Sequence, residues 1–445
     1  MVLKKKTKGK YKTNEDDYIS LVERTYILED DPLFPFLDNL CFLSKNVYNS
    51  TLYILRQAYF NKEPIPTYSE IDKNYRTAKN VDYLALPQKV SQHSEQLAVN
   101  AFKSFFGNLN SKKKSGDTRV IKLPNYLNTE SGRQTVFYSS QAVSTKNLEK
   151  DGYYTLSKVV DEEGKLIKFK TSIKESIQFV RIAHLGNHIS IEVGYRKCVK
   201  RNRIEKRIAS IDLGVDNIVT LTTNFDSPII FNGKPIKYIN HEYNSQIAKN
   251  QSSNAKCNGI KDNKWTKHMK KIAFRRKCKL TDYFHKLSRI IVNYLVSNHV
   301  TDLIIGKNDG WKQNTSMGSK NNQNFVCIPF NMLISMLEYK CVIEGIRVHT
   351  ICESHTSKCS FLDNEDICHH DNYVGKRKNR DLFYSANGMC INADVNGSYN
   401  IMRRWCIENK KECLLKFAKH EVCKNPKVIT LKLNGKKCDI GDYMK

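Results

Sequence analysis

Hydrophobic residues in the first half of the chain change their spacing from helical to strand-like near residue 133. Between Leu37 and Ala58 they recur at steps of three and four, which predicts one face of a long helix. A second helix is expected from Pro87 to Gly107, because proline favours the first helical turn and glycine a helix end. From Arg133 to Tyr195 hydrophobic and polar residues alternate, as in strands with one buried face. We therefore expect a small β-barrel or sheet that begins with Leu21–Leu28 and contains an inserted helical segment.

The second half alternates short hydrophobic runs with helical stripes. Ile208–Ile211 and Ile218–Leu221 flank Asp212-Leu213-Gly214, which predicts two strands joined by a tight turn. Further elements are expected in the order helix, strand, helix, strand and helix, at 265–300, 301–306, 330–341, 347–352 and from Asp394 onward. The polar segment 240–264 predicts a loop, and the residues beyond Trp405 show no clear pattern.

A chain of 445 residues is too long for a single hydrophobic core, so two or three domains are expected. The predicted class is a multidomain α+β protein. The predicted boundaries are a basic arm at 1–15, a β-barrel from 16–32 and 126–205, a helical domain at 33–125, an α/β domain at 206–404 with an insertion at 354–390, and a tail at 405–445.

The charge balance favours a polyanionic partner. The chain holds 73 Lys and Arg residues against 45 Asp and Glu residues, a formal net charge of +28. Each basic side chain placed against a phosphate releases counterions, which favours nucleic acid as the partner. No hydrophobic run approaches the length of a membrane span. We expect the 14 cysteines to be reduced thiols, because the chain shows no secretory signal and no C-x-x-C pair.

Three acids fall at predicted strand ends or at a helix start. Asp212 and Glu353 follow hydrophobic strands, and Asp394 opens the last helix. Hydrolysis of a phosphodiester with two Mg²⁺ ions needs such a set, because hard cations take oxygen ligands and close carboxylates repel one another without a cation. The alternative is three unrelated surface acids, with Asp212 capping a turn.

The ordered motifs of this half resemble a known family. They are I-D-L-G-V-D-N at 211–217, G-K-N-D-G-W-K-Q at 306–313, N-N-Q-N-F-V-C-I-P-F at 321–330, E-S-H-T-S-K-C-S-F-L-D at 353–363 and I-N-A-D-V-N-G-S-Y-N-I at 391–401. Together they are similar to the TnpB nucleases and their Fanzor relatives, transposon-associated ancestors of type V CRISPR effectors, over about residues 208–404.

The resemblance implies an RNase H-like (RuvC) nuclease domain preceded by a β-barrel wedge domain with an inserted helical recognition domain. It implies two Mg²⁺ ions held by Asp212, Glu353 and Asp394, with Asp212 as the first catalytic acid and Asp394 as the third. It also implies a guide RNA copied from the transposon end and a double-stranded DNA target next to a short flanking motif that the protein reads. The ribonucleoprotein is expected to contain one copy of the chain, in the nucleus for a eukaryotic or viral Fanzor-type protein and in the cytoplasm for a bacterial TnpB.

The second acid departs from the usual family pattern. Most members carry it at the end of the strand that here ends at Gly306, whereas this chain offers Glu353 after the next strand. In the RNase H-like strand order that strand lies one place further from Asp212, so Glu353 has to reach across about 9–10 Å. Glycine at 306 removes the side chain that would block it.

The insertion also departs from the family, whose members have two C-x-x-C pairs there. Cys359, Cys368 and Cys390 are too scattered for a standard site, so structural zinc is not expected. Candidate nucleic-acid contacts, each with a packing role or a solvated charge as the alternative, are Trp311, Lys312, Gln313, Arg275, Arg276, Lys376, Arg377 and Arg380.

The predicted function is an RNA-guided, metal-dependent DNA endonuclease. One alternative is a guide-bound but catalytically silent DNA binder that acts as a repressor or a transposition accessory. Another is a structure-specific nuclease that works without RNA. The presence of all three acids argues against the silent binder, and the long segments upstream exceed what a junction nuclease needs.

Overall fold

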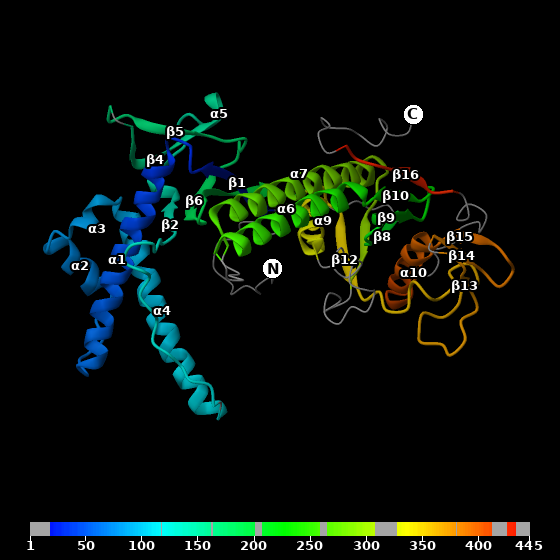
Figure 1. The fold of residues 1–445 in the computed structure, drawn as a ribbon, viewed down its shortest axis with the longest axis horizontal. Helices are drawn as coiled ribbons and strands as arrows, with labels where there is room; N and C mark the ends of the chain where they lie inside the picture. The colour runs from blue at the N-terminus through cyan, green and yellow to red at the C-terminus, as the bar shows by residue number, and fades with distance from the viewer. Residues whose placement is uncertain are drawn as a thin grey trace, which may run out of the picture. The chain divides into compact units, whose positions relative to one another are not determined.

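The computed structural model describes residues 18–116, 118–161, 163–200, 207–258, 265–307, 327–379, 381–411 and 425–432. They divide into two compact units, one formed by Ser20–Lys197 and the other mainly by residues from Cys198 onward. The two units are described separately below (Figure 1). The predicted basic arm lies outside the described residues, and the domain boundaries given above stay a prediction.

The first unit contains two long helices that pack along one another, α1 (Phe34–Phe60) and α4 (Gln88–Ser115), with the shorter α2 (Tyr68–Thr77) and α3 (Val81–Ala85) beside them. The predicted end of α4 at Gly107 is wrong. The helix continues to Gly116, which adopts the left-handed conformation that glycine tolerates best. Lys112, Lys113 and Lys114 in the last turn favour this longer helix through the helix dipole.

The strands of the first unit form two sheets. One has the order β1-β7-β6-β2, from β1 (Tyr18–Leu28), β7 (His188–Cys198), β6 (Ile177–His184) and β2 (Val136–Ser139). The other has the order β3-β4-β5, from β3 (Val143–Ser144), β4 (Tyr153–Val160) and β5 (Leu166–Lys170), with the short α5 (Leu148–Asp151) between β3 and β4. The helices therefore lie in sequence between β1 and its sheet partners. Helices and strands share one hydrophobic core.

A six-stranded mixed sheet forms the centre of the second unit. Its order is β12-β11-β8-β9-β10-β16, from β12 (Arg347–Ile351), β11 (Asp302–Gly306), β8 (Ile208–Asp212), β9 (Asn217–Thr223), β10 (Ile229–Asn232) and β16 (Lys427–Ile429). The first three strands are parallel, and β9 is antiparallel to both β8 and β10. The last strand, β16, pairs in parallel with β10 and was not predicted, because it is only three residues long within a polar tail.

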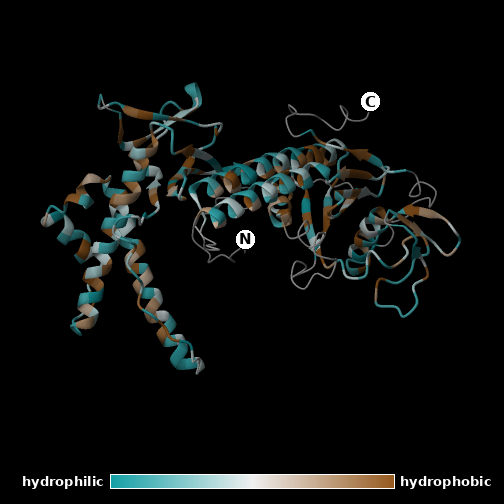
Figure 2. Cartoon of the chain, viewed as in Figure 1, coloured by the Kyte–Doolittle hydropathy of each residue, from teal (hydrophilic) through white to brown (hydrophobic). Residues whose placement is uncertain are grey.

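Helices cover both faces of this sheet. Along β11, Leu303 and Ile305 pack with α7 (Lys267–Ser297) and α9 (Phe330–Ile343), whereas Ile304 between them packs with α10 (Ala393–Glu408). This is the alternation that a strand buried on both faces requires. In Figure 2 hydrophobic residues mark much of the central sheet, whereas hydrophilic and hydrophobic residues alternate along the helices.

The predicted loop at 240–264 is wrong for most of its length, because α6 spans Lys234–Asn258. The polar composition of α6 belongs to its exposed face, while Ile236, Ile239 and Ile247 are buried, and the helix packs along α7. These few hydrophobic residues are too widely spaced to show a helical stripe in the sequence. The predicted helix at 265–300 and the strands at 208–221, 301–306 and 347–352 are confirmed to within a few residues.

The insertion between β12 and α10 folds into a small three-stranded sheet. Its strands are β13 (Lys376–Arg377), β14 (Leu382–Tyr384) and β15 (Cys390–Asn392), and β15 leads directly into α10. A separate hydrophobic cluster that includes Phe361, Phe383 and Tyr399 joins this sheet to α10. Within the described ranges, no helix combines the length and hydrophobicity needed to cross a bilayer.

One buried charge in the first unit has no compensating contact. Glu95 on α4 is fully buried, and its carboxylate oxygens have no hydrogen-bond partner among the described residues. Burial, reinforced by the negative charge of Asp72, raises the pKa of Glu95 to about 8. The folded state therefore holds a proton that the unfolded chain releases above about pH 4.5, so the free energy of unfolding falls as the pH rises from about 4.5 to 8.

Replacement of Glu95 by Gln should remove this pH dependence, because the amide keeps the size of the side chain and carries no charge. At pH 8 we expect the calorimetric transition of the first unit to rise by roughly 4 °C or more, and at pH 4.5 to be unchanged. The exposed Glu149→Gln serves as the control and should shift neither value. An equal shift at both pH values would show that Glu95 is not the group that titrates.

Candidate active site

Asp212 ends β8 in the middle of the sheet, paired with Thr220 of β9. Helix α10 lies directly over it, and a Cβ atom added to Gly397 would stand 2.7 Å from Asp212 Oδ2. Burial raises the pKa of Asp212 well above its usual value, and the negative charges of Glu353 and Asp394 raise it further. The three acids predicted from the sequence are thus near enough to interact electrostatically.

The side chain of Glu353 reaches the region of Asp212 by passing over Gly306. Ile305 of β11 pairs with Ile211 of β8, so Gly306 and Asp212 stand at the same end of adjacent strands. A Cβ atom on Gly306 would lie 2.9 Å from Glu353 Oε2 and would also collide with Ile401. The side chain of Glu353 therefore passes over the position that glycine leaves open, as the sequence predicts. Burial raises the pKa of Glu353 to about 7.

Asp394 lies in the first turn of α10, where the helix dipole favours a negative charge. The cap residue Asn392 accepts hydrogen bonds from the backbone amides of Asp394 and Val395, at 3.0 and 3.2 Å. Asn217 Nδ2 donates to Asp394 Oδ2 at 2.7 Å, and Arg377 Nη2 lies 3.7 Å from Asp394 Oδ1. Sequence reasoning gave Asn217 no role, although it stands at the end of the motif that begins with Ile211.

The donor set fits a divalent cation by its chemistry. Its three side chains are carboxylates, the hard oxygen ligands that Mg²⁺ prefers, and the repulsion that raises the pKa of Asp212 is what a cation would relieve. As they stand, no three His, Cys, Asp or Glu side chains of the described residues are close enough together to hold a metal ion. The carboxylates would therefore have to draw together when a cation binds.

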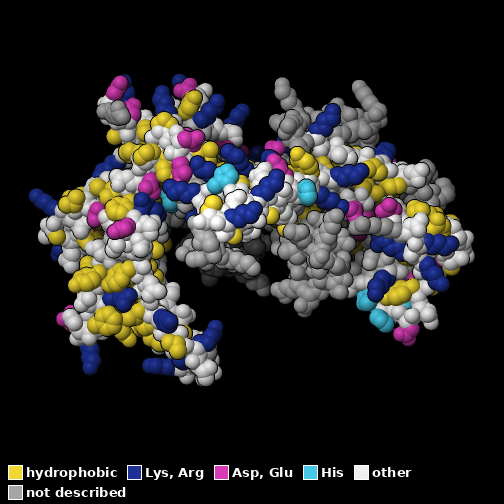
Figure 3. All heavy atoms as spheres, in the orientation of Figure 1, with side chains coloured by type: hydrophobic (Ala, Val, Ile, Leu, Met, Phe, Trp, Pro, Cys, Tyr) yellow, Lys and Arg dark blue, Asp and Glu magenta, His cyan; other side chains and the backbone are white. Residues whose placement is uncertain are grey.

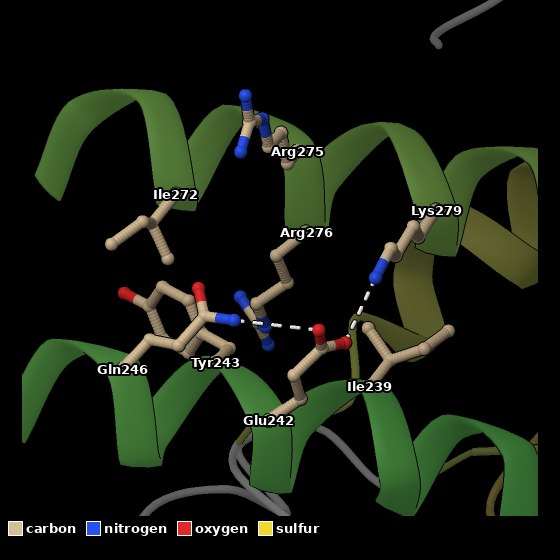
Figure 4. Close-up of a pocket in the computed structure, with 8 residues that line it drawn as sticks. All are labelled: Ile239, Glu242, Tyr243, Gln246, Ile272, Arg275, Arg276 and Lys279. Carbon is tan, nitrogen blue, oxygen red and sulfur yellow. Dashed lines mark hydrogen bonds and ion pairs between the residues drawn. The ribbon is translucent and has the colours of Figure 1, made fainter. Parts of the chain in front are cut away.

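Two of the candidate nucleic-acid contacts, Arg275 and Arg276, lie on α7 in different surroundings. Arg276 lines a pocket between α6 and α7 (Figure 4). It donates to Asn240 Oδ1 at 2.8 Å and to the Cys327 carbonyl at 2.6 Å. These bonds give Arg276 a role in holding α6 and α7 together, which agrees with the packing alternative given above. Arg275 is exposed and points away from Glu242 across the pocket in Figure 4.

The remaining predicted contacts lie in the insertion or outside the described residues. Lys376 is exposed on β13, and its neighbour Arg377 lies beside Asp394, as described above. The other predicted contacts, which all fall outside the described residues, are Trp311, Lys312, Gln313 and Arg380.

The cysteines of the insertion do not form a zinc ligand set among the described residues. Cys359 is buried, and its thiol donates to the Cys368 carbonyl at 3.6 Å. The Cys368 thiol instead faces His370 Nε2 at 3.3 Å, and Cys390 lies on β15. The residues present therefore do not fit the tetrahedral thiolate site of a zinc ribbon.

A polar groove in the first unit is a second candidate site. It has a volume of about 340 Å³ and lies between α4 and the segment that follows β2. Its lining residues are Lys89, Gln92, His93, Gln96, Phe137, Ser139, Ser140 and Gln141. The His93 ring lies 4.5 Å from the Phe137 ring, which stacks on Phe179 at 5.3 Å. The sequence contains a polar stripe at 89, 92, 93 and 96 on one helix face, but it does not indicate which strand residues lie opposite this stripe.

The burial of Glu353 predicts a specific effect on stability. Glu353→Gln should raise the melting temperature of the metal-free protein at pH 8, because it removes a buried charge whose pKa is near 7. The same change should abolish the stabilisation that Mg²⁺ gives the wild type, which is about 1.4 kcal/mol at ten times the dissociation constant. Differential scanning fluorimetry with and without Mg²⁺ measures both effects.

Glu338→Gln is the control, because Glu338 lies on α9 and is only partly buried. It should leave both the melting temperature and the response to Mg²⁺ unchanged. A wild type that Mg²⁺ does not stabilise would contradict the metal site.

Two family models match the chain in succession. Residues 188–312 match the OrfB_IS605 family, described as a probable transposase, and residues 330–401 match the TNB domain of Cas12f1-like proteins. The first segment contains Asp212, and the second contains Glu353 and Asp394.

One curated relative and two solved structures illustrate the similarity. The TnpB-like protein ORF457 of Acidianus two-tailed virus is 22% identical over 405 residues, which cover 83% of each chain. The Cas12f1–sgRNA–target DNA complex matches with a TM-score of 0.45 and 11% identity, over 82% of both chains. The mini-RNA-guided endonuclease CRISPR-Cas_phi3 matches with a TM-score of 0.41 and 11% identity, over 87% of this chain and 92% of that one. The comparisons agree with the TnpB part of the resemblance, because residues 188–312 are similar to the OrfB_IS605 family and residues 330–401 to the Cas12f1-like TNB domain.

Proposed function

We propose that the chain is an RNA-guided, metal-dependent DNA endonuclease with a RuvC-type centre. One observation carries this proposal: Asp212, Glu353 and Asp394 come from three separate segments and lie near one end of the central sheet, where the charges of Glu353 and Asp394 add to burial in raising the pKa of Asp212. Three unrelated surface acids would not act on one carboxylate in this way. The match to a probable transposase family and to a Cas12f1-like domain supports the same function.

The roles of the residues follow from their positions. Asp212, Glu353 and Asp394 would hold the metal. Two bound Mg²⁺ ions would supply an activated water and a stabilised leaving oxygen. Asn217 fixes the orientation of the Asp394 carboxylate through its 2.7 Å hydrogen bond. Arg377, which is exposed and lies 3.7 Å from Asp394, is placed to hold a phosphate of the strand that enters the site.

The surface of the second unit supports a nucleic-acid substrate. Many Lys and Arg side chains spread over the visible face of α6 and α7 (Figure 3). Arg275, Lys277 and Lys279 are exposed on α7. Together with the net charge of +28, these side chains favour contacts with the phosphates of a guide RNA and its DNA target. Base pairing with a guide copied from the transposon end would then select the sequence.

The groove of the first unit suits the reading of a short flanking motif. Glutamine side chains can pair bidentately with adenine in the major groove, and Lys89 at the rim can hold a phosphate. Gln96 is exposed and is therefore accessible to a base edge, although its side chain also contacts Tyr68, whereas Gln92 is partly buried and donates to Asp72 Oδ1 at 3.3 Å. We accordingly assign the groove to the protein–DNA contact that does not depend on the guide.

Asp212→Asn should separate cleavage from binding. Loss of one metal ligand should lower single-turnover cleavage of a guide-matched duplex by about 10³-fold or more, because the chemistry depends on the metal site. Binding of guide and target should change by less than about threefold, because phosphate contacts elsewhere supply the affinity. Cleavage gels and gel-shift assays on the same ribonucleoprotein measure the two effects. Equal losses of cleavage and binding would contradict this division of roles.

Gln96→Ala should change which flanking sequences are accepted and leave the chemistry intact. A bidentate contact is worth about 1–3 kcal/mol of discrimination, so preference at one flanking position should relax about tenfold. Cleavage of a library with randomised flanking bases measures this preference. Gln178→Ala, an exposed glutamine of the same unit that does not line the groove, is the matched control. An unchanged preference in Gln96→Ala would remove this residue from the recognition site.

A further inference from the structure

Glu353 lies in a position that the central sheet does not hold by itself. It follows β12, which is the edge strand of the sheet, and the ladder between β12 and β11 ends at the pair Gly306–Ile351. The Lys307 amide adds one more bond between the two strands, to the Ile351 carbonyl at 2.9 Å. The insertion that follows has no zinc ligand set in its described residues. Further contacts hold the turn that begins at Glu353.

Two buried asparagines of α10 provide them. Asn400 Nδ2 donates to the Thr356 carbonyl at 2.9 Å and to the Cys359 carbonyl at 2.7 Å. Asn396 Nδ2 also donates to the Cys359 carbonyl at 2.9 Å, and its Oδ1 accepts the Phe361 amide at 2.9 Å. Both side chains are fully buried. The backbone after Glu353 is thus attached to the helix that carries Asp394.

A short chain of bonds leads from Asn400 back to Glu353. The Thr356 amide and hydroxyl both donate to the Glu353 carbonyl, at 3.2 and 2.8 Å. Arg404, one turn further along α10, donates to the Ser354 carbonyl at 3.0 Å. Thr356 therefore closes the turn that begins at Glu353, and Asn400 and Arg404 attach this turn to α10.

The same helix is fixed to the sheet by its other face. Ser398 Oγ lies 2.9 Å from Thr222 Oγ1 and 3.2 Å from Ser210 Oγ, and all three hydroxyls are buried. Ser210 belongs to β8, which ends at Asp212, and Thr222 belongs to β9, which begins at Asn217. A displacement of the turn at Glu353 would therefore break buried hydrogen bonds to α10, each costing about 1–3 kcal/mol.

We propose that Asn400, assisted by Asn396, is a positioning residue that fixes Glu353 relative to Asp212 and Asp394. An acid at position 306 would be held in place by the backbone hydrogen bonds of β11. For Glu353, the asparagine contacts hold the backbone in place instead. This inference rests on the proposed metal-dependent function of the three acids. Asn400 acts only through its amide nitrogen, because its Oδ1 has no hydrogen-bond partner among the described residues.

Asn400→Asp tests the proposal, because it keeps the shape of the side chain and replaces the donor by an acceptor that faces two carbonyls. We expect the Mg²⁺ midpoint of single-turnover cleavage to rise about tenfold or more, with the rate partly restored at saturating Mg²⁺ and target binding unchanged. Mn²⁺ affinity by calorimetry should fall in parallel. Asn409→Asp introduces the same charge at the exposed end of α10 and should change neither quantity.

Thr356→Val tests the same link without a new charge, because it removes only the hydroxyl bond to the Glu353 carbonyl. It should shift the Mg²⁺ midpoint in the same direction by a smaller factor, and it keeps the test decisive if Asn400→Asp does not fold. Unchanged Mg²⁺ midpoints and Mn²⁺ affinities in the folded variants would overturn the positioning role. A wild type that neither cleaves nor binds Mn²⁺ would instead overturn the proposed function.

Discussion

The close packing of α10 on the end of β8 is the constraint on which the candidate site depends. Gly397 brings the helix backbone so near to the sheet that a Cβ atom would stand 2.7 Å from Asp212 Oδ2. Buried hydroxyls of Ser398, Ser210 and Thr222 join the helix to β8 and β9 at the same level. The helix thereby places its own acid, Asp394, beside Asp212. Any larger residue at 397 would separate the two.

The close packing places carboxylates together in a buried position, which destabilises the folded state. Burial and mutual repulsion raise the pKa of Asp212, and burial raises that of Glu353 to about 7. A structural role would favour neutral side chains here, because buried carboxylates without a cation destabilise the fold. Asn217 contacts Asp394, and the positive charge of Arg377 beside Asp394 only partly offsets the raised pKa of Asp212. An arrangement that keeps destabilising charges together is typical of a site that binds cations.

The sequence predicted the parts of this site whose signals are local. Hydrophobic runs located β8, β11 and β12, and a glycine at 306 indicated how Glu353 could reach Asp212; the structure agrees with both. The failures came from tertiary packing. Helix α6 was missed because its few buried residues contact α7. Helix α4 passes through Gly107 and ends at Gly116, so the first glycine was not the helix end.

Roles that depend on contacts between distant segments were also invisible in the sequence. Arg276 was expected on a nucleic-acid surface, but its hydrogen bonds to Asn240 and Cys327 hold protein segments together. The groove of the first unit combines a helix face with residues after β2, some 40 positions apart in the chain. The hydrogen bonds that Asn396 and Asn400 make to the backbone after Glu353 form only when the insertion is folded. Periodicity identifies faces, but it does not say which faces meet.

The central claim is that three carboxylates from β8, the turn after β12 and α10 close around divalent cations. Anomalous scattering from Mn²⁺ in crystals of the guide-bound protein tests this most directly. The account predicts anomalous peaks within about 2.3 Å of carboxylate oxygens of Asp212, Glu353 and Asp394 together. Mn²⁺ bound by Asp212 and Asp394 with Glu353 turned away, or no peak at this end of the sheet, would contradict it.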